Sequence, residues 1–65
     1  MIVHLDGRPQ KFHPGATVRD LAGRLEDAAR EAWKRGELII TDADGHEVGS
    51  GGALSDGATY RTRAV

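Results

Sequence analysis

The sequence contains no cysteine, only two prolines and only three aromatic residues. Without thiols the chain forms neither a disulfide framework nor a thiolate metal site, so a compact core or a partner must stabilise it. No apolar run reaches the 18 residues needed to span a bilayer, and the opening MIVHL has no basic flank or cleavage site. We therefore expect a cytoplasmic protein without membrane span or signal peptide.

The charge balance argues against nonspecific DNA binding as the function, and the length limits the number of domains. The 65 residues carry nine basic and ten acidic side chains, a formal net charge of -1. Neither half of the chain is basic enough for the broad cationic surface typical of nonspecific DNA binding. At this length only roughly 60% of the unfolded chain's surface is buried on folding, so we expect residues 1–65 to form a single domain.

Alternation of apolar and polar residues predicts strands at both ends of the chain. In residues 1–6, Met1, Val3 and Leu5 share one face, as in a half-buried strand. Residues 6–9 (DGRP) predict a break, and residues 10–13 a return strand with Phe12 turned inward. Residues 58–65 (ATYRTRAV) alternate again, with Tyr60 inward.

The middle of the chain predicts one long helix and a second hairpin. Apolar residues recur at helical spacing from Val18 to Trp33, with Thr17 at the N-cap position and Gly36 after the last turn. This pattern predicts 18 helical residues, about 27 Å at 1.5 Å per residue. A strand at 37–41 (ELIIT), a turn at 42–45 (DADG), a short return strand at 46–48 and a glycine-rich, mobile loop at 49–52 are expected to follow.

This order resembles the β-grasp fold of ubiquitin-like proteins, in particular small prokaryotic ones. The features that carry the resemblance are the first hairpin, Thr17 and Val18 opening the helix, the ELIIT strand, the DADG turn and Leu54-Ser55-Asp56 before the last strand. The resemblance implies an α+β fold, ββαβ(β)β, whose mixed sheet carries one long helix across one face. It also implies a non-catalytic protein-interaction module, an adaptor or a modifier.

Two alternatives within the same fold group stay open. Residues 12–22 (FHPGATVRDLA) are similar to the entry of TGS domains, and that likeness implies contacts with RNA or ribosomes, although residues 42–52 are longer than the hairpin expected there. Ubiquitin-like modifiers and sulfur carriers act through a C-terminal Gly-Gly, whereas this chain ends Arg63-Ala64-Val65. A carrier role would need a tail beyond Val65. Cleavage after the internal Gly51-Gly52 would remove the last strand.

No motif in the sequence clearly indicates a metal-binding or catalytic site. The DADG segment has the first ligands of a calcium loop without its twelve-residue spacing or closing glutamate, so a hairpin turn explains it better. His4, His13 and His46 have no third ligand fixed beside them, and we expect no metal and no cofactor. The sequence shows no Ser-His-Asp pattern, no thiol nucleophile and no carboxylate pair, and so small a domain has little room for a pocket of about 300 Å³. We therefore expect no catalysis.

The open face of the expected sheet holds the candidate partner-binding residues. Alternation places Ile2 and His4 of the first strand, Ile39 of the third, and Arg61 and Arg63 of the last on the face away from the helix. Arginine beside exposed aliphatic residues is favoured at protein interfaces. The sequence therefore predicts that a protein partner binds here, with RNA as the weaker alternative. Self-association would use a sheet edge at the second strand or the short return strand.

Overall fold

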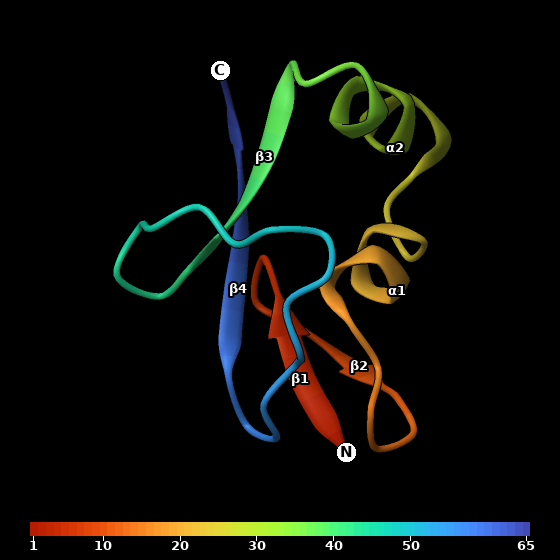
Figure 1. Cartoon of the computed structure of the whole chain (residues 1–65), viewed down its shortest axis with the longest axis vertical. Coiled ribbons are helices and arrows are strands. Elements are labelled where there is room, and N and C mark those ends of the chain that lie inside the picture. The colour runs from red at the N-terminus through yellow and green to blue at the C-terminus, as the bar shows by residue number, and fades with distance from the viewer.

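The computed structural model describes all residues, 1–65, as a small compact α+β domain with a mixed four-stranded sheet and two helices on one side of it (Figure 1). The strands β1 (Ile2–Leu5), β2 (Arg8–Lys11), β3 (Leu38–Asp42) and β4 (Thr59–Ala64) lie in the order β2-β1-β4-β3. The helices α1 (Val18–Ala22) and α2 (Asp27–Lys34) connect β2 to β3. Neither α1 nor α2 has the length and the apolar character that a membrane-spanning helix needs.

The two ends of the chain form the parallel pair at the centre of the sheet. His4 lies opposite Thr59 and Leu5 opposite Tyr60, while β2 and β3 pair antiparallel on the two outer sides. The backbone N–H of His4 donates to the Ala58 carbonyl at 2.9 Å, and that of Asp6 to the Tyr60 carbonyl at 3.0 Å. Because these contacts join opposite ends of the sequence, they close the domain.

Two aspartates bracket this short parallel pair. At the start of β1, the Ile2 N–H donates to Asp56 Oδ1 at 2.8 Å. Past its end, Asp6 Oδ1 accepts the Thr62 N–H at 2.9 Å and Asp6 Oδ2 accepts the Thr62 hydroxyl at 2.7 Å. The Asp56 carboxylate therefore holds the first N–H of β1, and the Asp6 carboxylate extends the contact with β4 beyond the last residue of β1.

The first hairpin is tighter than the sequence analysis predicts. Asp6 and Gly7 both have positive φ, 51° and 81°, as a two-residue turn of type I′ requires. The return strand therefore begins at Arg8 instead of Gln10 and includes Pro9, which has no N–H. Pro9 is tolerated because β2 is an edge strand of the sheet.

The prediction of one long helix is wrong. α1 ends at Ala22, where the N–H groups of Arg24 and Leu25 bond to carbonyls only three residues back, a tightening typical of a last helical turn. Glu26 is extended (φ -61°, ψ 156°) and α2 starts at the next residue. Gly23, a weak helix former, stands at the break, and the change of direction lets α2 pack on β3.

Other expectations for the helical region are confirmed. The Thr17 N–H donates to Asp20 Oδ2 at 2.8 Å, so α1 begins where the N-cap pattern predicts. Gly36 takes positive φ (77°) after α2, as its place beyond the last turn requires.

The prediction of a short return strand at 46–48 is wrong. Only a single bridge, between Glu47 and Thr41, forms there.

The core lies between the sheet, α1 and the segment before β4. Val3, Val18, Leu21 and Ile40 are its largest fully buried side chains, and Trp33 is half-buried at its edge. α2 buries no residue completely, whereas three of the five residues of α1 are buried. The ten buried apolar residues are Val3, Leu5, Phe12, Ala16, Val18, Leu21, Ala22, Ile40, Leu54 and Tyr60.

Asp6→Ala should destabilise the domain by about 2 kcal/mol, because two hydrogen bonds to a carboxylate are lost and alanine is strained at positive φ. Asp6→Asn, which tolerates that φ and keeps an acceptor for Thr62, should cost less than about 0.5 kcal/mol. Urea unfolding followed by circular dichroism measures both. Equal losses for the two variants would show that the Asp6–Thr62 contact does not hold β4 to the hairpin.

Candidate functional site

The face of the sheet opposite the helices carries the candidate binding residues. Cross-strand pairs share a face, so the register assigns this surface directly. Ile39 lies opposite Arg63, Thr41 opposite Arg61, Ile2 opposite Lys11, and His4 opposite both Pro9 and Thr59. All five residues predicted from the sequence, Ile2, His4, Ile39, Arg61 and Arg63, thus have registers that place them on this face.

The structure spreads these five residues along the sheet, with Ile2 and Arg63 far apart and His4 beside Thr59, two residues before Arg61. Ile39, Arg61 and Arg63 form one group, which we call the β3–β4 patch. Ile2 and His4, with Lys11, form a second group, the β1–β2 patch. Gly57 bonds to the Ile2 carbonyl, and six residues of extended chain, about 20 Å, separate Gly57 from Arg63. The alternation rule gives the face of each side chain correctly but not its position along the sheet.

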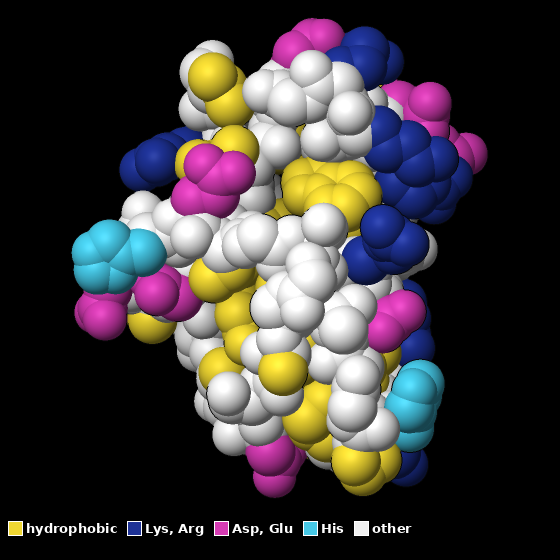
Figure 2. All heavy atoms as spheres, in the orientation of Figure 1, with side chains coloured by type: hydrophobic (Ala, Val, Ile, Leu, Met, Phe, Trp, Pro, Cys, Tyr) yellow, Lys and Arg dark blue, Asp and Glu magenta, His cyan; other side chains and the backbone are white.

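The open face is rich in cations that have no partner within the chain. Lys11, Arg61 and Arg63 take part in no ion pair and no side-chain hydrogen bond, whereas Arg30, Lys34 and Arg35 on and after α2 each pair with a carboxylate. Two acidic residues are in register with this face: Glu47, which bridges to Thr41, and Glu37, whose carbonyl accepts the Val65 N–H at 3.0 Å and whose carboxylate pairs with Arg35. Figure 2, in the orientation of Figure 1, shows basic side chains over the helices with acidic ones beside them.

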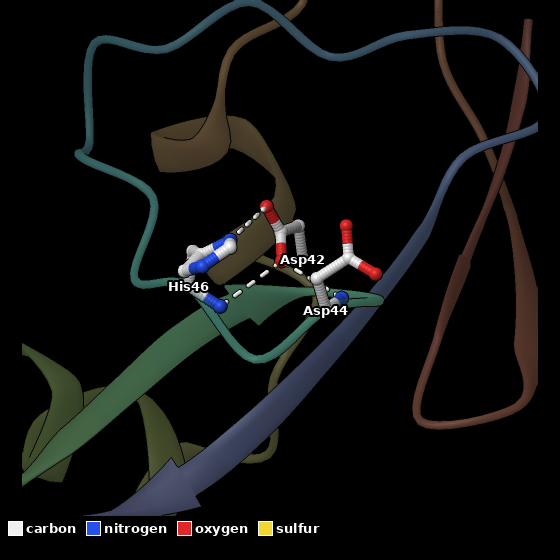
Figure 3. A group of neighbouring side chains, drawn as sticks. All are labelled: Asp42, Asp44 and His46. Atoms are coloured by element: carbon white, nitrogen blue, oxygen red, sulfur yellow. Dashed lines mark hydrogen bonds and ion pairs between the residues drawn. The ribbon is translucent and has the colours of Figure 1, made fainter.

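The turn after β3 gathers Asp42, Asp44 and His46, whose possible ligand atoms lie within 4.8 Å of one another (Figure 3). Asp42 Oδ1 accepts the backbone N–H of Asp44 at 2.9 Å and of His46 at 3.0 Å, and Oδ2 lies 3.6 Å from His46 Nδ1. Gly45 takes positive φ (87°). Asp42 therefore organises the tight turn that the DADG sequence indicates, while His4 and His13 belong to no group of three possible ligands.

These hydrogen bonds lower the pKa of Asp42. The backbone N–H of His46 is the largest cause, and the N–H of Asp44 and the charge of His46 act in the same direction. Both N–H donors favour the ionised carboxylate over the protonated acid. Asp42 thus binds a proton less readily in the folded chain than in the unfolded one.

A cleft on the helix side is larger than the sequence analysis expects. It encloses about 330 Å³ where the helix break faces the end of the first hairpin. Its lining comes from β1, β2, the segment between the helices, α2 and β4, and consists of Leu5, Asp6, Arg8, Gln10, Arg24, Leu25, Glu26, Ala29 and Thr62. The expectation of little room for a pocket rested on the small size of the domain and on one continuous helix over the sheet, and the break between the two helices opens this cleft.

The internal Gly51-Gly52 pair is held by hydrogen bonds. The Gly52 carbonyl accepts the Val18 N–H at 2.9 Å, and Ala53 forms a bridge with Thr17. As expected, residues 49–52 form no helix or strand. Cleavage at the pair would separate β4 from its neighbours β1 and β3.

Comparison with known proteins adds no relative: no family model, no curated protein and no solved structure matches the chain.

Asp42→Asn should lower the free energy of unfolding more at pH 6 than at pH 2.5. A lowered pKa in the folded state stabilises the fold above the unfolded-state pKa of about 3.9, and this contribution is lost as the pH falls through the folded-state value. Urea unfolding of wild type and variant at both pH values measures the difference. Asp44→Asn, which removes a carboxylate that accepts no hydrogen bond, is the control. An identical difference at both pH values would contradict this role of Asp42.

Proposed function

We propose that this chain is a non-catalytic β-grasp, ubiquitin-like interaction module that binds an acidic protein partner through the β3–β4 patch. The element order and the strand order β2-β1-β4-β3, with its parallel central pair, support the ubiquitin-like assignment. The packing of both helices on one face of the sheet supports it as well, because neither helix covers the other face (Figure 1).

The observation that carries the proposal is the pairing of Ile39 with Arg63 in a surface with unpaired arginines. Ile39 is half-buried, Arg61 and Arg63 are exposed, and no carboxylate lies within ion-pair distance of either guanidinium. Arginine supplies apolar area and several hydrogen-bond donors, and it is enriched at protein interfaces where lysine is depleted. The β3–β4 patch is therefore favoured over the β1–β2 patch, whose cation is Lys11.

The positive charge of the β3–β4 patch favours a partner with an acidic contact surface. Two unpaired guanidinium groups on adjacent positions of one strand face complement carboxylates and speed association with an acidic surface. The aliphatic side chain of Ile39 between the strands favours a partner segment that carries apolar residues next to its acidic ones. We therefore propose a protein partner whose contact segment alternates carboxylate and aliphatic side chains.

Arg61→Glu and Arg63→Glu should each weaken partner binding by about tenfold or more, because an attractive contact becomes repulsive at the centre of the interface. Partners captured by the wild-type chain are identified, and their affinity for each variant is measured by calorimetry. Lys11→Glu is the matched control: it makes the same charge change on the same face, at the β1–β2 patch.

Two results decide between this proposal and its competitors. Equal loss of affinity for Lys11→Glu and Arg63→Glu would mean that the β3–β4 patch is not the specific site. The unpaired cations Lys11, Arg61 and Arg63 also favour the alternative of an RNA-contacting module, which predicts RNA retention at low salt and a steep loss of affinity as salt rises. Filter binding of RNA over a salt series tests that alternative, and RNA bound more tightly than any protein would displace our proposal.

A further inference from the structure

The cleft at the helix break has a chemistry that the open face does not share. We propose that it is a binding site for a small aliphatic carboxylate, held by Arg24 over an apolar floor. The site lies on the opposite side of the sheet from the β3–β4 patch and is independent of the proposed partner-binding function. Its volume of about 330 Å³ is at the lower end of the range for ligand pockets, which suits a small molecule.

Arg24 is a cation fixed in place before any ligand arrives. Its guanidinium carbon stands 4.3 Å from the centre of the Phe12 ring, a cation–π geometry. Its Nη2 donates to the Lys11 carbonyl at 3.0 Å, and its Nη1 to Gln10 Oε1 at 3.4 Å. These contacts use two of the five N–H donors of the guanidinium and leave three for a planar carboxylate. A ligand would therefore meet an ordered cation and lose little side-chain entropy on binding.

The neighbouring side chains complete a site for an anion with an apolar body. Gln10 accepts from Arg24 through its oxygen, so its amide NH2 is free to donate. Arg8, also on β2, lines the cleft and takes part in no ion pair or side-chain hydrogen bond. Leu5, Leu25 and Ala29 supply the apolar lining, and Leu5 is 5% exposed. Each methylene group of a ligand laid on this floor contributes to affinity by leaving water.

Two acidic residues, Asp6 and Glu26, also line the cleft, and only Asp6 makes side-chain hydrogen bonds within the chain. Both oxygens of Asp6 accept hydrogen bonds from Thr62, so this carboxylate is occupied by the fold. Glu26 forms no ion pair and no side-chain hydrogen bond, and it is exposed. For a carboxylate ligand Glu26 is repulsive, so the proposal predicts opposite signs for changes at Glu26 and at the two arginines.

Titration with sodium hexanoate, followed by amide chemical shifts in 1H–15N spectra at constant ionic strength, tests the proposal. We expect saturable shifts at Leu25, Ala29 and Thr62, with a Kd on the order of 1 mM as befits so small a ligand. 1-Hexanol, which has the same apolar body without the charge, and hexylammonium, which has the opposite charge, should bind at least about tenfold more weakly.

Variants then assign the contacts. Arg24→Gln should weaken hexanoate binding by about tenfold or more, and Arg8→Gln by a few fold, whereas Glu26→Gln should strengthen it by a few fold. Arg8 and Glu26 make no side-chain hydrogen bond or ion pair, so we expect Arg8→Gln and Glu26→Gln to fold. If Arg24→Gln unfolds, these two variants still test whether the cleft binds a carboxylate. Arg19→Gln, which removes an unpaired cation outside the cleft, should leave the Kd unchanged.

Several results would overturn the proposal. Equal binding of hexanol and hexanoate would show that the cleft does not recognise a carboxylate. Weaker hexanoate binding by Glu26→Gln would point to recognition of a cationic group instead. Shifts centred on Arg61 and Arg63 would mean that hexanoate merely follows the positive charge of the open face.

Discussion

The fold depends on the parallel pairing of β1 with β4, the two ends of the chain. A parallel pair needs a long crossover, and here that crossover contains both helices, β3 and the segment before β4. β1 has only four residues, so its backbone makes few bonds to β4. Asp56 and Asp6 extend this contact at either end with side-chain oxygens, and the core residues Val3, Leu5 and Tyr60 pack on the helix side of the same pair.

The same pairing determines which surfaces are available for binding. Because β4 extends beyond the end of β1, Arg63 stands next to β3 alone, whereas Arg61 lies beside Asp6, the residue that follows β1. The open face therefore has a β3–β4 patch and a β1–β2 patch. On the other side, the break between α1 and α2 leaves the end of the first hairpin uncovered and opens the cleft beside Arg24. One domain of 65 residues thus presents two separate surfaces with different chemistry: an aliphatic–arginine strand face and a polar cleft with an apolar floor.

Sequence reasoning succeeded at several features with a local signal, although it misplaced the start of β2 and predicted a return strand at 46–48 that does not form. The inward set of β1, the N-cap at Thr17, the left-handed Gly36 and the turn at Asp42–Gly45 follow from side-chain alternation, capping and turn chemistry. It failed at the helix because the apolar spacing continues through Gly23, and periodicity cannot distinguish one helix from two that bury the same face. Gly23 was the one residue in the sequence that indicated the break. Because the cleft lined by Arg24 lies at this break, Gly23 was also the one indication of the cleft.

The sequence by itself determined the four main strands, the start of the first helix and the face of each strand residue, because these depend on neighbours within a few positions. Only the tertiary structure decided the register of β1 against β4, the separation of Ile2 from Ile39 and Arg63, and the direction of α2. Each of these depends on contacts between residues far apart in the chain, where the side-chain period fixes a face but not a distance.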